Sequence, residues 1–393
     1  MRVSVDAGRN AMRRRMTRGN RTRSPGRRSP ACGTWTPSTE HCMQTLPLRS
    51  GIFRNLQCAR AFAALAVVGY HMGVLPFGQA GVDVFFVISG FIMSVVAPRE
   101  GRSFLRKRLI RIVPLYWLTT LGVFAIAVVK PQWLNSTTAG VDYLVKSLLF
   151  VPYVKENGHW GPLNLNGWTL EYEMLFYLVI AGLMLFVRAR HVTTLAALAL
   201  ALFCAYVAAG GPASAVVAHL GQPFVLEFGL GVLACRLLET GIAARLSRFA
   251  WLASIAAALV AIPLVAALSG TPAGFERVFW WGMPACMLIV ALVALDLRGW
   301  SIGNTTLARL GDASYSIYLL HPYVIGAANK IVGVRLDAGT WSGSATALAT
   351  LVAVCACGYA CHVWIERPML AGLKPWMSRK PRASTGSSGS TTV

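Results

Sequence analysis

The sequence predicts an all-α, polytopic integral membrane protein: a helical bundle with about ten transmembrane helices and both termini in the cytoplasm. Apolar residues make up 55% of the 393 residues and charged residues only 13%, whereas roughly 25% of residues in soluble domains are charged. The apolar residues come in runs close to the ~20 residues that cross a bilayer as a helix. The basic residues gather in alternate connections, as the positive-inside rule requires.

Ten ranges have the length and hydropathy of a membrane-spanning helix. They are 56–75, 82–98, 112–129, 168–187, 192–209, 223–240, 250–268, 278–296, 312–333 and 342–364. With the N-terminus in the cytoplasm, most of the 37 lysines and arginines lie on the inner side, which is the topology of a multi-pass protein of the plasma or inner membrane. The net charge of +22 therefore reflects topology. We expect contact with membrane lipids and no nucleic-acid partner.

Two low-complexity segments flank the predicted membrane domain, which covers residues 54–370. Residues 1–50 are basic and poor in acidic residues, so they are expected to be disordered. They could be an arm that lies on anionic lipid, an organelle transit peptide, or an over-extended start with Met43 as the initiator. The tail at residues 378–393 is expected to be flexible and cytoplasmic.

The nine cysteines suggest neither a disulfide framework nor a metal centre. Most of them lie inside predicted spans, and the chain has no Cys-x-x-Cys pair and no His-Cys metal spacing. We therefore expect no metal site.

The first predicted span carries Arg60 and His71 in an otherwise apolar run. A helix places the two residues on nearly the same face, about 16 Å apart along its axis. Because an ionisable group in hydrocarbon costs roughly 2.5–3.5 kcal/mol on insertion scales, the pair is expected to have a partner or a task. A neutral imidazole can take a proton from an alcohol and return it to a leaving group. The alternative is a structural histidine bonded to a carbonyl.

Asp83 opens the second predicted span from the outer side, at the depth of His71. Its carboxylate could accept the imidazole N–H and stabilise the imidazolium. It could also cap the helix N-terminus, where a negative charge is favourable. Ser89 and Gly90, further along the same run, are interpreted as packing residues.

Arg108 and Arg111 lie one helical turn apart at the inner end of the third span. Arginine side chains bind phosphate oxygens in bidentate geometry. Basic residues are also expected at this boundary for topology alone, so both interpretations stay open.

The connection at residues 130–167 is the longest on the outer side, and long loops are often functional. We interpret it as a lid or acceptor-binding surface, with a short interfacial helix at residues 141–150. The next span contains Glu171 and Glu173, which point about 200° apart on a helix, and the surrounding pattern favours Glu173. Trp168 and Tyr177 could contact a sugar or belong to an aromatic belt.

The ninth span carries a polar stripe. Ser314, Tyr318 and His321 fall within about 60° of one another on a helix. Hydrogen bonds between helices would explain the stripe adequately.

Taken together, five segments occur in an order that resembles the acyltransferase 3 family of integral-membrane proteins, over roughly residues 54–370. They are the Arg60/His71 pair and the runs Gly81–Met93, Arg108–Trp117, Trp168–Tyr177 and Gly311–Pro322. The last two runs, Trp168–Tyr177 and Gly311–Pro322, are most similar to the exopolysaccharide-production, ExoZ-like branch.

The resemblance implies O-acylation: an acyl group, with acetyl expected, moves from cytoplasmic acyl-CoA to a hydroxyl of a carbohydrate. The acceptor would be exopolysaccharide or its lipid-linked precursor, and acyl-CoA would be a co-substrate, with no bound cofactor. Donor binding would fall to Arg60, Arg108 and Arg111. The catalytic group would be His71, Asp83 and Glu173, in which Asp83 orients His71 and Glu173 positions the acceptor. Acceptor contacts would come from Trp168, Tyr177, Tyr318 and His321.

A proton-coupled transporter or flippase of a glycan-related substrate is the alternative, because intramembrane His, Asp, Glu and Arg also suit proton-coupled transport. Transporters of this kind often show internal repeats, and we find none in the sequence. A silent membrane scaffold is disfavoured by the intact set of Arg60, His71, Asp83 and Glu173.

Overall fold

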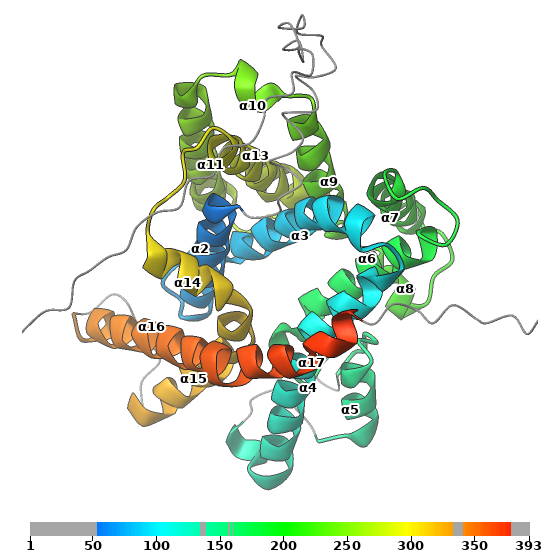
Figure 1. Ribbon diagram of the computed structural model, residues 1–393. Helices are drawn as coiled ribbons and strands as arrows, with labels where there is room; N and C mark the ends of the chain where they lie inside the picture. Colours follow the sequence, from blue (N-terminus) through cyan, green and yellow to red (C-terminus); the bar gives the residue numbers. More distant parts are fainter. Residues whose placement is uncertain (1–52, 134–138, 156–157, 159, 333–340, 379–393) are drawn as a thin grey trace, which may run out of the picture.

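The computed structural model describes residues 53–133, 139–155, 158, 160–332 and 341–378 as a bundle of helices (Figure 1). The sole β pairing in this part of the chain is an isolated bridge between Val154 and Trp160. The predicted all-helical class is confirmed. The predictions for residues 1–50 and for the tail beyond Ser378 lie outside the described residues.

Each of the ten predicted ranges overlaps a helix. The helices are α2 (Arg54–His71), α3 (Ala80–Glu100), α4 (Phe104–Val129), α5 (Val141–Leu148), α6 (Trp168–Leu183), α7 (Val192–Ala208), α8 (Ala215–Leu220), α9 (Val225–Glu239), α10 (Ile242–Arg245), α11 (Arg248–Ser269), α12 (Gly274–Arg277), α13 (Met283–Leu297), α14 (Thr305–Asp312), α15 (Ser314–Val332), α16 (Trp341–Cys361) and α17 (Arg367–Ser378). A single π-helical turn at Val278–Gly282 precedes α13, and another at His362–Glu366 precedes α17.

Five stretches of the described chain are long and apolar enough to cross a membrane. They are Pro76–Val129, Ala215–Glu239, Arg248–Ser269, Gly274–Leu297 and Gly343–Trp376. The protein is therefore an integral membrane protein by length and composition. Ten crossings and cytoplasmic termini stay predictions.

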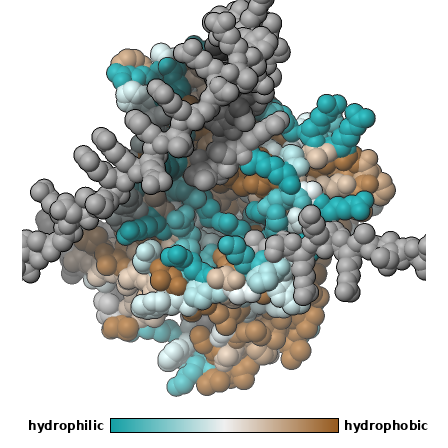
Figure 2. Space-filling model, in the orientation of Figure 1, coloured by the Kyte–Doolittle hydropathy of each residue, from teal (hydrophilic) through white to brown (hydrophobic). Residues whose placement is uncertain are grey.

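The surface of the bundle is apolar where lipid would surround it. Helix α11 buries only Trp251, Ala258 and Ile262 and exposes large side chains such as Leu259 and Leu268. Figure 2 shows hydrophilic residues across the middle of one face and hydrophobic residues around its periphery. Because contiguous exposed apolar surface is rare in soluble monomers, this distribution fits a bundle viewed from a polar end.

Helix α3 is the core of the bundle and lies between α2 and α9 (Figure 1). It meets α9 at two glycines. A Cβ atom at Gly90 would lie 2.0 Å from the carbonyl oxygen of Phe228, and one at Gly231 would lie 2.1 Å from that of Val87. The backbones of α3 and α9 can approach this closely only because neither glycine has a side chain.

We expect Gly90→Ala to destabilise the protein by about 1–3 kcal/mol, the usual cost of overpacking, because the new methyl group overlaps a backbone carbonyl. Gly122→Ala on α4 is the matched control, since its Cβ would meet nothing within 4 Å, and alanine is the better helix former. Thermal unfolding in detergent measures both variants. Equal melting temperatures would contradict the close contact.

The predicted interfacial helix is present as α5. Its Val141 and Val145 side chains are exposed, and Ser147 is buried. Tyr116 and Trp117 on α4 donate hydrogen bonds to the carbonyl groups of Ser147 (3.1 Å) and Leu148 (2.9 Å). These bonds hold α5 against α4, and its exposed valines are available to the membrane interface.

Candidate functional site

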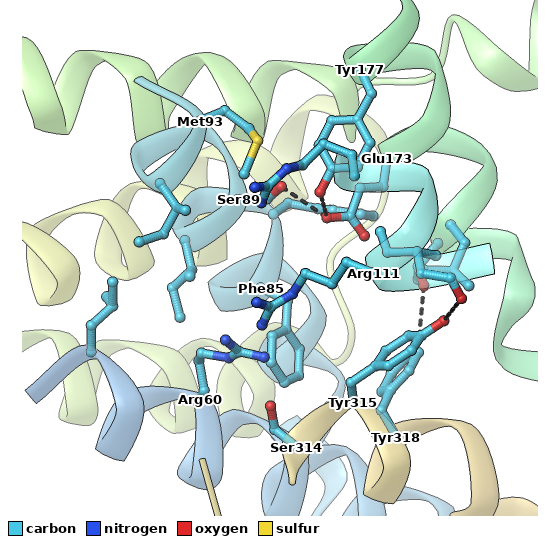
Figure 3. Close-up of a pocket in the computed structure, with 18 of the residues that line it drawn as sticks. Arg60, Phe85, Ser89, Met93, Arg111, Glu173, Tyr177, Ser314, Tyr315 and Tyr318 are labelled. Atoms are coloured by element: carbon cyan, nitrogen blue, oxygen red, sulfur yellow. Dashed lines mark hydrogen bonds between the residues drawn. The ribbon is translucent and has the colours of Figure 1, made fainter. Parts of the chain in front are cut away.

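A cavity of about 330 Å³ contains the three arginines that the sequence analysis selected, and we name it the arginine cavity. Arg60 enters it from α2, and Arg108 and Arg111 enter from α4. Most of the remaining wall is aliphatic or aromatic, with Phe85 and Met93 among its residues. In Figure 3 the guanidinium groups of Arg60 and Arg111 lie close together beside Phe85.

Arg60 and Arg111 bring two positive charges to the cavity, and neither forms a salt bridge within the described residues. The nearest acidic side chain in the same wall is Glu173, whose charge acts on Arg60 over a longer distance. The nearby ion pairs join Lys107 and Arg108 to Glu100 at 3.7 and 2.9 Å, and take up neither Arg60 nor Arg111. Two guanidinium groups that face one cavity are a suitable receptor for a phosphate or carboxylate.

Arg108 has a different environment from Arg111, although the sequence suggested the same task for both. Its Nη2 atom donates to both carboxylate oxygens of Glu100, at 2.9 and 3.1 Å. Its guanidinium also lies over the ring of Phe104. Arg108 lines the cavity, but its charge is already shared with Glu100.

Glu173 lies in the arginine cavity with Tyr177 and Ser89. Its Oε1 atom accepts hydrogen bonds from Ser89 Oγ at 3.0 Å and from the hydroxyl group of Tyr177, as Figure 3 shows. Ser89, which the sequence analysis treated as a packing residue, is therefore a donor to a cavity carboxylate. The structure brings Glu173 and Tyr177 to the end of the site that holds the arginines.

Glu171, two residues earlier on α6, points elsewhere. Its Oε2 atom lies 3.5 Å from Nε2 of His219, and both side chains are buried. The ring of Trp160 stacks on that of His219 with centroids 4.4 Å apart. The two glutamates of α6 thus serve different parts of the bundle.

A second cavity of about 160 Å³ lies at the other end of α2 and contains His71; we name it the His71 cavity. Its wall is mostly polar or aromatic. It consists of Val67, Tyr70, His71, Gln79, Val82, Asn166, Trp168, Arg277 and Tyr318. Two of these residues, Val82 and Tyr318, also line the arginine cavity, so the two cavities adjoin.

The nearest imidazole to His71 is that of His321. The ring centroids are 5.0 Å apart at an angle of 48°, and His321 is fully buried. The amide nitrogen of Asn166 lies 3.4 Å from His321 Nδ1 and donates to the carbonyl group of Tyr318 at 2.5 Å. No described residue bonds to His321 Nε2. Tyr318 and His321 thus lie on the His71 side.

The partner of Asp83 is Arg277, and this corrects the expectation that Asp83 bonds to His71. Arg277 donates from Nε to Oδ1 at 3.0 Å and from Nη2 to Oδ2 at 2.7 Å. It also donates to the side chain and the carbonyl group of Gln79, at 3.0 and 3.2 Å. With both its oxygens bound to Arg277, Asp83 supports the wall of the His71 cavity.

Sequence reasoning missed Arg277. It directly follows Glu276 at the start of an apolar run, and the sequence analysis gave it no role. The signal was present, because an arginine beside a membrane span is expected to have an acidic partner. The partner lies 194 residues earlier in the chain, so the sequence could not identify it.

We expect Arg277→Met to destabilise the protein by about 3–5 kcal/mol, because it leaves the fully buried Asp83 without its counter-charge. The double variant Asp83→Asn/Arg277→Met should recover much of that loss, since it removes both charges. Thermal unfolding in detergent of the wild type, both single variants and the double variant measures the coupling. Purely additive effects would contradict a direct pair.

Comparison with known proteins relates both cavities to one family. The profile of the family described as "Acyltransferase domain" matches residues 53–363, which include every residue that lines the two cavities. The exopolysaccharide production protein ExoZ of Rhizobium meliloti (strain 1021) is 33% identical over 325 residues, which cover 79% of this chain and 94% of ExoZ. The acyltransferase MdmB of Streptomyces mycarofaciens is 29% identical over 372 residues, which cover 83% of this chain and 93% of MdmB. No solved structure matches the chain.

Proposed function

This chain belongs to the acyltransferase 3 family, and on that premise we propose that this membrane acyltransferase moves an acyl group, with acetyl expected, from acyl-CoA to a hydroxyl of a carbohydrate. One observation carries the proposal: a cavity with two guanidinium groups that form no salt bridge with the described residues adjoins a cavity with an imidazole. The first suits an anionic donor, and the second suits proton transfer from a hydroxyl group.

The arginine cavity is the donor site in this proposal. The phosphate groups of coenzyme A bind to Arg60 and Arg111, and the apolar wall accommodates the uncharged arm of the carrier. Arg108, bound to Glu100 at the same end, contributes to the positive potential of the entrance. Because this is the end predicted to be cytoplasmic, the donor enters from the cytoplasm.

His71 carries the proton in the transfer. It takes the proton of the acceptor hydroxyl as the hydroxyl oxygen attacks the thioester carbonyl carbon. The C–O bond of the ester forms, the C–S bond of the thioester breaks, and the proton passes to the sulfur, which leaves as the coenzyme A thiol. A relay of the acyl group through His71 is the other route.

Two carboxylates, Asp83 beside the His71 cavity and Glu173 in the arginine cavity, support the site without touching the transferred proton. Asp83 holds Arg277, and through it Gln79, in the wall of the His71 cavity. Glu173, fixed by Ser89 and Tyr177, lies in the wall of the donor cavity, where its charge acts on Arg60. These roles assign Asp83 and Glu173 to positioning rather than to proton transfer.

The acceptor in this proposal is exopolysaccharide or its lipid-linked precursor, and the protein works in the plasma or inner membrane. The name of the relative ExoZ associates that protein with exopolysaccharide production. In the His71 cavity, Trp168 provides an aromatic ring for a sugar face, and the amide groups of Gln79 and Asn166 can bond to hydroxyl groups.

The test is a transfer assay with purified protein in detergent. Acetyl-CoA labelled in the acetyl group is incubated with polysaccharide from the producing cell, and the label in the polymer and the free coenzyme A are measured. We expect the two products in equal amounts. No label in the polymer, together with no binding of acetyl-CoA by calorimetry, would overturn the proposal and favour the transporter alternative.

A further inference from the structure

Val82 and Tyr318 separate the arginine cavity from the His71 cavity, because both side chains belong to the walls of both cavities. Val82 comes from the first turns of α3, and Tyr318 comes from α15. A group that crosses this shared wall from one cavity to the other passes these two side chains. We name the two residues the Val82–Tyr318 boundary.

The boundary is held in place by its surroundings. The hydroxyl groups of Tyr318 and Thr169 are 3.0 Å apart, and the ring of Tyr318 packs edge-on against Phe85, with centroids 5.9 Å apart. The backbone carbonyl of Tyr318 accepts the bond from Asn166. Val82 is buried and β-branched, so its side chain has few rotamers. The space at the shared wall therefore depends on the sizes of the Val82 and Tyr318 side chains.

The two cavities differ in what they can accommodate. The wall of the arginine cavity is mostly apolar. The His71 cavity has about half its volume, and its aliphatic wall is limited to Val67 and Val82 beside His71, Gln79 and Arg277. A long hydrocarbon chain there would separate polar groups from water or from the acceptor without replacing their hydrogen bonds, which is unfavourable.

We propose that the Val82–Tyr318 boundary selects donors with short acyl groups of about two to four carbons, since pockets discriminate by side-chain contact with each methylene. This inference rests on the proposed function. The acyl group passes between Val82 and Tyr318 to reach His71, and the carrier arm stays in the arginine cavity. The thioester C–S bond then breaks, the ester C–O bond forms, and the hydroxyl proton passes through His71 to the sulfur of coenzyme A.

The experiment compares acetyl-, butyryl-, hexanoyl- and octanoyl-CoA as donors with the same polysaccharide acceptor. The wild type should lose roughly tenfold or more in kcat/KM between butyryl- and hexanoyl-CoA, the discrimination that a pocket gains from an extra methylene or two. Val82→Ala should raise the ratio of hexanoyl to acetyl transfer by roughly tenfold. Val82→Ile should lower the ratio of butyryl to acetyl transfer, so the two variants change the profile in opposite directions.

Val84→Ala on the same helix is the matched control, because Val84 is buried and lines neither cavity. Its donor profile should be that of the wild type. The inference is overturned by a wild type that uses octanoyl-CoA as well as acetyl-CoA, or by a Val82→Ala profile equal to that of Val84→Ala. Transfer without chain-length dependence would reject the boundary alone. Absence of both transfer and acetyl-CoA binding would reject the proposed function and the boundary together.

Discussion

His71→Ala is expected to lower kcat for acyl transfer by about 10²- to 10⁴-fold, the contribution of a general base, because it removes the only imidazole among the described residues that line the His71 cavity. The neighbouring His321 is fully buried and does not line that cavity. Since His71 is absent from the arginine cavity, acetyl-CoA should still bind with wild-type affinity. Labelled transfer and calorimetry measure the two quantities separately.

His191→Ala is the matched control for this variant. His191 is exposed and contacts Arg190, away from both cavities, so we expect normal activity. Retained turnover in His71→Ala would remove His71 from the mechanism. A parallel loss of acetyl-CoA binding would indicate a structural role instead, and would contradict the separation of the donor site from the proton-transfer site.

The double variant Arg60→Ala/Arg111→Ala is expected to weaken acetyl-CoA binding by about 10²- to 10⁴-fold, since each of the two arginines loses a charged hydrogen bond that contributes about 1.5–3 kcal/mol. The variant Arg60→Ala/Arg111→Lys should recover only part of the acetyl-CoA affinity that Arg60→Ala/Arg111→Ala loses, because an ammonium group keeps the charge but not the bidentate geometry. Calorimetry with acetyl-CoA at two salt concentrations measures the effect and its screening.

Arg108→Ala tests whether the structure is right to separate this residue from Arg111. Its charge is already shared with Glu100, so the loss of affinity should be smaller than for Arg111→Ala. The exposed Arg102, which lines neither cavity, provides the matched control. An unchanged affinity in Arg60→Ala/Arg111→Ala would remove both arginines from donor binding and leave Arg111 with a role in topology alone. A larger loss in Arg108→Ala than in Arg111→Ala would assign the donor phosphate to Arg108.

The helices could be predicted because the signals are local. Hydrophobic run length and the helical repeat are properties of neighbouring residues, and each of the ten predicted ranges overlaps a helix. The pairing of Arg60 with His71 on one helix is a local property as well. The sequence did not show that the two residues would line two different cavities, Arg60 the arginine cavity and His71 the His71 cavity.

The rotation of each helix about its axis depends on the neighbours it packs against, which the sequence does not specify. Tyr177 was expected to contact the acceptor, yet the structure places it with Glu173 in the arginine cavity. Arg108 and Arg111 share one helical turn, but only Arg108 meets Glu100 across the turn between α3 and α4. The sequence positions of Tyr177 and Arg108 did not show that these side chains would contact Glu173 and Glu100.

By itself, the sequence determined that the protein is a helical membrane protein and where its helices lie, because hydropathy and helical period are encoded in short segments. It also identified the polar residues that are costly in a membrane and therefore need a task. Only the tertiary structure decided the pairing of Asp83 with Arg277, the contact between His71 and His321, and the Val82–Tyr318 boundary. Each of these joins residues far apart in the chain, and their distance depends on how whole helices pack.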